Sequence, residues 1–104
     1  VLAVIPVDNY DEAIRVANNV VYGLTSSVYT RDIGRIMQYA DKVETGMLHV
    51  NSPTVGGEAQ APFGGVKATG IGGREMGSTA PEFFCEIKTV YIDYNTVVRK
   101  GNLY

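Results

Sequence analysis

The sequence contains one cysteine, Cys85, and one histidine, His49. A single cysteine cannot form a disulfide within the chain, which is compatible with a reducing compartment. No second histidine, cysteine or carboxylate lies near His49 at the spacing that protein metal sites use. We therefore expect no metal site here, and His49 is expected to be structural or adjacent to a substrate.

Long apolar runs and an excess of positive charge are also missing. No apolar run approaches the ~20 residues that a membrane-spanning helix requires. The apolar segment Val1–Val7 is too short for a signal peptide and has no charged start. Nine Lys and Arg residues face eleven Asp and Glu residues, a net charge of -2, and no basic face for nucleic acid is visible. The expectation is a cytoplasmic protein without nucleic-acid or membrane partners.

The 104 residues, 45% of them hydrophobic, are enough for one globular domain with one core. The β-branched run Val1–Val7 predicts a buried strand. Asn9, with Glu12 three residues later, predicts the start of a helix over Tyr10–Asn19. This helix should end before Gly23.

A second strand and helix follow at similar lengths. Residues Thr25–Tyr29 favour a strand, and Thr30 is the predicted N-cap of a helix with an apolar face at the 3.6-residue period. Gly46 should end that helix, and Met47–Val50 should form the next strand. Strand, helix, strand, helix, strand with short connections predicts an α/β fold, a β-α-β-α-β unit on a parallel sheet.

Residues 51–77 lose this periodicity and hold eight of the twelve glycines. A loop of this length in a compact domain is usually functional or disordered. Beyond it, Thr79 with Glu82 predicts a short helix that carries Phe83 and Phe84. Residues 88–94 alternate between polar and apolar, which predicts a strand with one buried face. Residues 95–104 carry no pattern and are expected to be a tail.

The glycines around Lys67 raise the question of a phosphate-binding loop. In a Walker loop the lysine follows a glycine and precedes Ser or Thr, whereas Lys67 precedes Gly70 and is followed by Ala68. In a dinucleotide fingerprint that starts at Gly70, the third glycine position is taken by Glu75. Neither phosphate interpretation fits.

Cys85, between apolar residues and a carboxylate, is expected to be a core or half-buried residue rather than a nucleophile.

Several ordered blocks resemble the carboxy-terminal signature of the NAD(P)-dependent aldehyde dehydrogenases. The central blocks are MLHVN (47–51), APFGGVK (61–67), TGIG (69–72) and REMG (74–77). Further blocks are YDEAI (10–14), YGL (22–24) and EIKTV (86–90). The resemblance extends from Val1 to about Tyr94 and suggests the last fifth of such an enzyme.

The resemblance implies that residues 1–80 end a catalytic domain and that residues 81–94 form a short helix and an oligomerisation arm. Enzymes of this family use a cysteine thiolate, an oxyanion-binding asparagine and a glutamate that activates water. The resemblance places these residues and the NAD or NADP site upstream, so no catalytic or cofactor-binding residue is expected in this chain, which should be inactive alone.

The resemblance also assigns substrate contacts. Asn51 ends the strand beneath the active site and should fix the loop that follows, and Ser52–Ala59 should line the mouth of the aldehyde pocket. Phe63 either flanks the aldehyde or anchors the glycine-rich loop 61–77, which we call the glycine loop. The expected substrate-binding residues are Asn51, Thr54, Val55, Gly57 and Phe63. No arginine lies in the 52–58 loop, which favours an uncharged, bulky or aromatic aldehyde.

The remaining expectations concern contacts between chains. Lys67, Gly70 and Gly72 resemble turn residues at a subunit contact, with positive φ at the glycines, and Arg74 with Glu75 resembles a structural ion pair or helix-start pair. The strand over 84–94 should cross to a second copy and form a homo-oligomer. The upstream part of the same enzyme is the other expected partner. The alternative is a non-catalytic interaction module that pairs with itself or with a separate upstream subunit.

Overall fold

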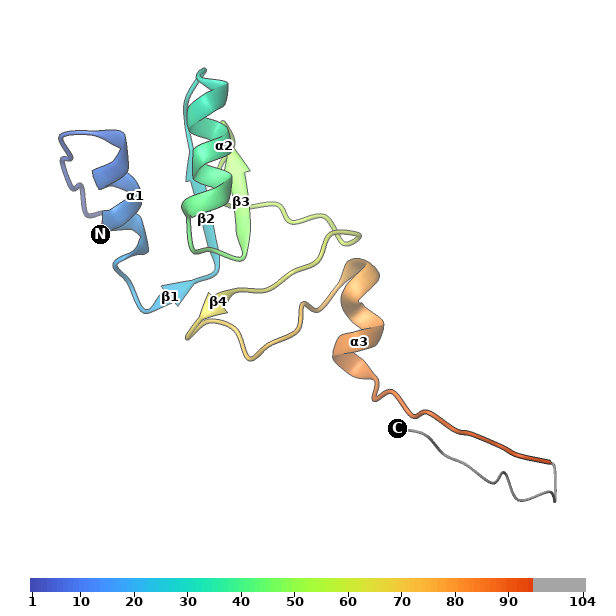
Figure 1. Cartoon of the computed structure of the whole chain (residues 1–104). Coiled ribbons are helices and arrows are strands. Elements are labelled where there is room, and N and C mark those ends of the chain that lie inside the picture. The colour runs from blue at the N-terminus through green and yellow to red at the C-terminus, as the bar shows by residue number, and fades with distance from the viewer. Residues whose placement is uncertain (95–104) are drawn as a thin grey trace, which may run out of the picture.

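The computed structural model describes residues 1–94. Two helices and four short strands occupy the first two thirds of the chain, and a small helix follows near the carboxyl end (Figure 1). The elements are α1 (Tyr10–Asn18), β1 (Tyr22–Gly23), β2 (Thr25–Val28), α2 (Ile33–Lys42), β3 (Met47–Val50), β4 (Val66–Lys67), a 3-10 helix (Gly77–Thr79) and α3 (Ala80–Phe84). The chain is thus of the mixed α/β class.

Strands β2 and β3 pair in parallel, with Ser27 opposite His49 and Val28 opposite Val50. Helix α2 makes the crossover between them. This part of the predicted strand-helix-strand unit is confirmed.

The predicted first strand, Val1–Val7, is wrong. These residues form no strand, and their side chains are exposed, with Val4 83% and Ile5 63% accessible. A strand needs a neighbouring backbone to complete its hydrogen bonds, and none lies beside this segment in the described chain. Instead, β1 pairs antiparallel with β4 from the glycine loop, and Tyr22 lies opposite Lys67. The predicted three-stranded parallel sheet is therefore a parallel pair and an antiparallel pair.

Helix α1 begins where the capping pattern predicts. The Asn9 side chain accepts a hydrogen bond of 2.9 Å from the Glu12 N–H. The Glu12 carboxylate turns back to the Asp8 N–H at 2.9 Å rather than to the N–H of Asn9. Two backbone donors at the helix start are thereby satisfied.

Helix α2 begins two residues later than the predicted cap at Thr30. Asp32 is the N-cap, and its carboxylate accepts from the N–H groups of Gly34 and Arg35. The Thr30 hydroxyl accepts a bond of 3.1 Å from the Asp32 N–H and so shapes the turn before the helix. A carboxylate is as good an N-cap as a hydroxyl and also favours the positive end of the helix dipole.

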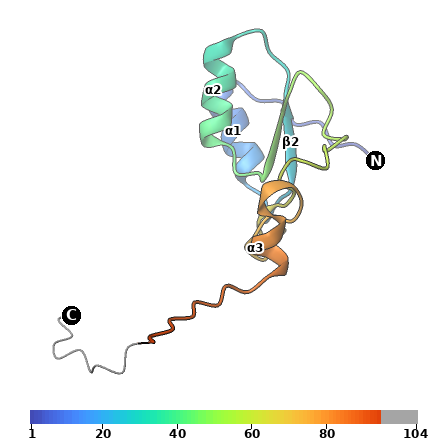
Figure 2. The same cartoon turned by 90° about the vertical axis from the view of Figure 1, so that its right-hand side faces the viewer.

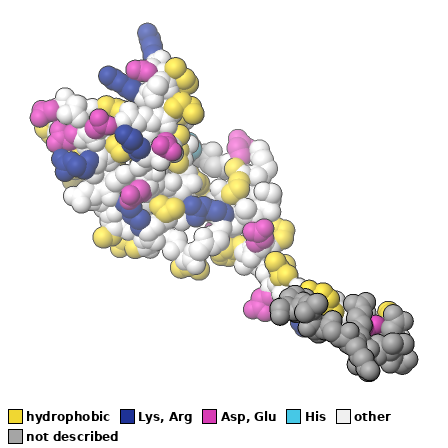
Figure 3. All heavy atoms as spheres, in the orientation of Figure 1, with side chains coloured by type: hydrophobic (Ala, Val, Ile, Leu, Met, Phe, Trp, Pro, Cys, Tyr) yellow, Lys and Arg dark blue, Asp and Glu magenta, His cyan; other side chains and the backbone are white. Residues whose placement is uncertain are grey.

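The buried core of the described residues is small. Ile14, Tyr39 and Val43 are buried, with Tyr10 and Val28 packed against them. Many large apolar side chains are instead exposed, as the yellow side chains on the visible face in Figure 3 show. The expected single core exists, but it covers only part of the apolar surface.

The parallel pair has two different faces. On one face, Val28 packs on the core and the Tyr39 hydroxyl donates to Ser26, so this face meets the helices. Ser27 and its partner His49 lie on the other face because side chains alternate along a strand. Figure 2 shows the helices on one side of β2 and the segment after β3 on the other. The polar face of the sheet is thus covered by the 51–62 segment.

Helix α3 lies where the short helix is predicted, although Thr79 makes no side-chain cap. Its hydroxyl donates to the Met76 carbonyl instead.

Residues 85–94 then run away from the body as an extended segment (Figures 1 and 2). Residues 88–94 form no strand in the described chain, and their side chains are exposed, so the predicted buried face is not found there. Cys85 is exposed rather than half-buried, because this segment leaves the core. The predicted tail, 95–104, lies outside the described residues.

Candidate functional site

Asn51 joins the ends of β2 and β3. Its side-chain N–H donates to the Thr30 carbonyl at 2.9 Å, and its side-chain oxygen accepts from the Thr30 N–H at 2.8 Å. The Asn51 backbone has φ of 55°, a left-handed conformation that asparagine tolerates better than most residues. Asn51 therefore extends the parallel pair by one rung and turns the chain into the following segment.

The segment 52–62 leaves the sheet edge and folds back over β3. The Ser27 hydroxyl donates to the Ser52 carbonyl at 2.5 Å, which fastens the start of this segment to the polar face. Thr54 and Val55 are exposed, with Val55 74% accessible. Two of the five predicted site residues therefore point to solvent in the described chain.

A groove of about 330 Å³ lies between β3 and the returning segment, and we call it the β3 groove. Its lining includes Met47 and His49 of β3 and Gly57, Glu58, Ala61 and Pro62 of the returning segment. Met47 and His49 share one face of β3, and both are half-buried. Gly57 is thus the predicted site residue that borders this groove.

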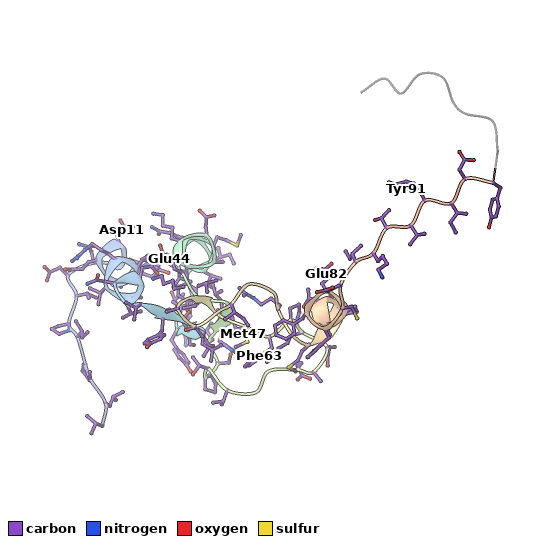
Figure 4. All side chains as sticks on the ribbon, turned by 90° about the horizontal axis from the view of Figure 1, so that it is seen from below. Asp11, Glu44, Met47, Phe63, Glu82 and Tyr91 are labelled. Atoms are coloured by element: carbon purple, nitrogen blue, oxygen red, sulfur yellow. The ribbon has the colours of Figure 1, made fainter. Side chains whose placement is uncertain are left out.

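A second groove, of about 310 Å³, lies beside Phe63, and we call it the Phe63 groove. Leu24 and Phe83 line it together with Phe63, and Glu75 contributes the acidic side chain. The Phe63 N–H donates to the Glu75 carbonyl at 2.7 Å, and a Cβ built on Gly57 would lie 3.8 Å from the Phe63 ring. Phe63 therefore lies between the 52–62 segment and α3. Met47 and Phe63 are labelled in Figure 4.

The glycine loop packs against itself instead of forming a phosphate cradle. A Cβ on Gly70 would lie 2.2 Å from the Gly65 carbonyl oxygen, so only glycine fits there. The Gly65 carbonyl also accepts from the Arg74 guanidinium at 2.6 Å. Arg74 thus contacts this carbonyl, and among the described residues it forms no ion pair with Glu75. Phosphate sites present backbone N–H groups to the anion. This loop instead turns the Gly65 carbonyl oxygen inward and borders the acidic Glu75, so it does not fit a cofactor phosphate.

The predicted turn residues behave differently from one another. Gly72 has φ of +127°, as expected, whereas Gly70 is not among the positive-φ residues and is required for the close approach just described. Lys67 has φ of 54°, and its side chain contacts this chain itself. Its ammonium lies 2.6 Å from the Asn18 carbonyl, 3.2 Å from the Val20 carbonyl and 2.5 Å from the Glu44 carboxylate. Lys67 thus connects the loop to the ends of both long helices.

Asn18 is a structural residue that the sequence patterns did not reveal. Its side-chain N–H donates to the Lys42 carbonyl and its oxygen accepts from the Glu44 N–H, both at 2.8 Å. The same residue's backbone carbonyl binds Lys67. An asparagine in the last turn of a predicted helix is the only sequence signal for such a role, and it does not name the partner.

Among residues 1–94, no three His, Cys, Asp or Glu side chains gather closely enough to hold a metal ion. In the same range, no helix combines the length and the apolar character needed to cross a membrane.

Solved structures share this fold. A salicylaldehyde dehydrogenase from Pseudomonas putida G7, solved with salicylaldehyde, superposes with a TM-score of 0.72 at 42% identity, over 85% of this chain and 19% of that one. An indole-3-acetaldehyde dehydrogenase superposes with a TM-score of 0.77 at 36% identity, over 85% of this chain and 20% of that one. The described fold is therefore that of aldehyde dehydrogenases.

Sequence comparisons agree. Residues 1–90 match the aldehyde dehydrogenase family. The α-ketoglutaric semialdehyde dehydrogenase of Bacillus subtilis is 42% identical over 88% of this chain, and the 2,5-dioxopentanoate dehydrogenase of Saccharolobus solfataricus is 48% identical over 88%. The chain belongs to the aldehyde dehydrogenase family. It spans 19% of the length of both relatives.

Proposed function

We propose that this chain is the carboxy-terminal part of an NAD(P)-dependent aldehyde dehydrogenase and that it supplies the rim of the substrate pocket and contacts between subunits. The family match over residues 1–90, at about a fifth of the length of the relatives, carries this proposal. The complete enzyme would oxidise an aldehyde to a carboxylic acid in the cytoplasm.

In the proposed reaction, a cysteine thiolate outside this chain attacks the aldehyde carbon. NAD(P)+, bound by the rest of the enzyme, would accept the hydride from that carbon and leave a thioester on the cysteine. Water then cleaves the thioester, releases the acid and restores the thiol. This chain contributes none of the reacting groups. Its exposed Cys85 lies at the start of the extended segment and not in either groove.

The exposed apolar surface supports a larger fold around this chain. Val4 and Ile5 are more than half accessible, and on α2 Ile33 is 70% and Met37 62% accessible. The spacing of Ile33 and Met37 places both side chains on one helix face. Isolated soluble domains rarely expose contiguous apolar patches of large size. The upstream part of the same enzyme is the partner that we propose for these faces.

The proposed substrate rim consists of Asn51, Thr54, Val55, Gly57 and Phe63. Asn51 holds the start of the segment through its two bonds to Thr30. Thr54 and Val55 are free to face a pocket completed by upstream residues, and Phe63 presents an aromatic surface to the Phe63 groove. Phe63 fits both a substrate contact and an anchor for the loop, since aromatic side chains serve both purposes.

The extended segment supports the proposed homo-oligomer. Ile87 is 91% and Tyr91 93% accessible, and the described chain offers these residues no neighbouring strand. Figure 4 shows Tyr91 on this segment, well away from Met47 and Phe63. Adding an extended segment to the sheet edge of a second subunit would satisfy its backbone groups and cover its apolar side chains.

Formation of reduced cofactor tests the catalytic proposal. The complete enzyme should reduce NAD+ or NADP+ in the presence of an aldehyde, and this chain alone should not. Turnover by the purified chain would overturn the assignment of the reacting groups to upstream residues. Inactivity of the complete enzyme toward a broad aldehyde panel would overturn the activity itself.

The second candidate is a non-catalytic interaction module, which the exposed extended segment favours. Such a module would pair with itself or with a separate upstream subunit. Mixing the purified chain with the upstream part tests this, because a module would form a stable complex that shows no aldehyde oxidation. Restored oxidation on mixing would instead support the enzyme.

A further inference from the structure

His49 occupies the polar face of β3, where the β3 groove forms. His49 lies opposite Ser27 in the parallel pair. The side chains of Ser26 and Val28 face the helices, so those of Ser27 and His49 face the other side of the sheet. The 52–62 segment closes the other side of the groove with Gly57 and Glu58. The groove thus brings the only histidine of the chain beside the segment that we propose as the substrate rim.

The imidazole of His49 forms no hydrogen bond with the described residues, although the residue is half-buried. A neutral imidazole carries one N–H donor and one acceptor nitrogen. Neither nitrogen of the half-buried His49 ring has a protein partner within residues 1–94. A donor or acceptor that is shielded from water and lacks a hydrogen bond costs free energy, so the site favours a ligand that can bond to one of these nitrogens.

The remaining lining defines the shape and charge of that ligand. The thioether of Met47 and the rings and methyl groups of Ala61 and Pro62 are apolar, and Gly57 has no side chain to fill the space. A volume of about 330 Å³ is at the small end of ligand pockets. Methionine sulfur packs favourably against aromatic rings. Glu58 at the rim disfavours a second carboxylate.

Resting on the proposed function, we propose that His49 is a specificity-determining residue that binds the hydroxyl group of an uncharged, hydroxylated aromatic aldehyde in the β3 groove. The hydroxyl can accept from the imidazole N–H or donate to its free nitrogen, while the ring lies on Met47. Recognition of a group remote from the reacting carbon stabilises ground state and transition state alike, so it acts on KM more than on kcat.

The test compares 4-hydroxybenzaldehyde, benzaldehyde and succinic semialdehyde as substrates of the complete enzyme. The wild type should favour 4-hydroxybenzaldehyde over both others in kcat/KM. His49→Leu should reduce kcat/KM for 4-hydroxybenzaldehyde by about tenfold, mainly through KM, and change benzaldehyde little. His49→Gln, which keeps a donor and an acceptor, should retain more of the preference. Val50→Ala, on the opposite face of the same strand, is the control and should keep the wild-type preference.

Each outcome decides one of the two proposals. Equal loss for 4-hydroxybenzaldehyde and benzaldehyde in His49→Leu would overturn the specificity role and leave the proposed function standing. A wild type that oxidises benzaldehyde without favouring its hydroxylated form would also overturn it, even if neither His49 variant folds. A wild type that oxidises none of the three aldehydes and no other aldehyde would overturn the proposed function first.

Discussion

The Lys67 ammonium lies 2.5 Å from the Glu44 carboxylate and 2.6 Å from the Asn18 carbonyl at the end of α1. The lysine comes from the glycine loop, and Glu44 follows α2. One side chain therefore holds together three segments that are far apart in the sequence. Positive charge at a helix carboxyl end is favourable because the last carbonyl groups there lack helical partners.

Replacement of Lys67 by methionine should destabilise this connection. The lysine side chain is only 23% exposed, so its bonds are poorly replaced by water, and we expect a loss of about 2 kcal/mol in unfolding free energy. Glu44→Gln is the matched variant. The Glu44 side chain is 56% exposed, and this change keeps both carbonyl bonds of Lys67, so its loss should be below about 1 kcal/mol. Urea unfolding of the complete enzyme measures the free energy of unfolding of both variants. If Lys67→Met and Glu44→Gln lose the same amount, the ion pair alone accounts for the stabilisation by Lys67.

Substitution of Asn51 tests the connection between β2 and β3. Asn51→Ala loses both bonds to Thr30 and places alanine at φ of 55°, which together should cost about 2–3 kcal/mol. Asn51→Gly loses the same bonds but tolerates the backbone conformation, so it should be less damaging by about 1 kcal/mol. The unfolding temperatures of Asn51→Ala and Asn51→Gly, compared with that of the wild type, measure this difference. If alanine and glycine lower the unfolding temperature equally, backbone strain at this position has no role.

Sequence patterns predicted the elements whose causes are local. The cap at Asn9 and the short helix after Thr79 depend on neighbours within a few residues, and their positions were right to within a residue or two. The bounds of the two strands around α2 followed from local residue types, and their parallel pairing followed from the short connections to the helix between them. The class of aldehyde dehydrogenase followed from ordered blocks rather than from any one motif. Local chemistry therefore determined much of the first half of the chain.

The features that the sequence did not reveal depend on distant neighbours. Val1–Val7 has the composition of a strand, but composition does not supply a neighbouring backbone. The antiparallel pairing of Tyr22 with Lys67, and the bonds of Asn18 to the end of α2, join residues that are more than twenty positions apart. In the candidate site, Asn51 was identified through a resemblance, but its partner Thr30 was assigned to a helix cap instead.

The glycine loop offers a comparison between two glycines. In Gly70→Ala the new Cβ would lie 2.2 Å from the Gly65 carbonyl oxygen, so the backbone must move. In Gly72→Ala nothing lies within 4 Å, and only the strain at φ of +127° remains, worth about 1–3 kcal/mol. Gly70→Ala should therefore lower the unfolding temperature more than Gly72→Ala does. A larger effect at Gly72 would show that the loop is not closely packed at Gly70.

Tyr10 should make stability depend on alkaline pH. Its hydroxyl donates to the Arg35 carbonyl at 2.7 Å. Burial raises the pKa of the Tyr10 phenol, as does neighbouring Tyr39, while Arg35 opposes the rise. Since the folded state holds this proton more tightly than the unfolded state, the contribution is complete below about pH 10, the unfolded value. It is lost as the pH rises through the raised folded pKa.

Tyr10→Phe should therefore have two effects. At neutral pH the lost hydrogen bond should cost about 1 kcal/mol. Above pH 10 the decline in stability should be shallower than in the wild type, because the variant has no proton to lose at this position. Urea unfolding across the pH range from neutral to alkaline measures both. An unchanged alkaline slope would show that the phenol ionises equally easily in both states.

The extended segment tests the proposed assembly. Val90 and Ile92 share one face of an extended chain, and Thr89 lies on the other. If the face of Ile92, now 67% exposed, packs on a second subunit, then Ile92→Asp buries an unpaired carboxylate there and should shift the complete enzyme toward smaller species. Thr89→Asp adds the same charge on the opposite face and should leave the assembly intact. Light scattering coupled to size-exclusion chromatography gives the mass of each. Dissociation by both variants would mean that charge on the segment, and not burial of one face, controls assembly, whereas dissociation by neither would place the subunit contact elsewhere in the enzyme.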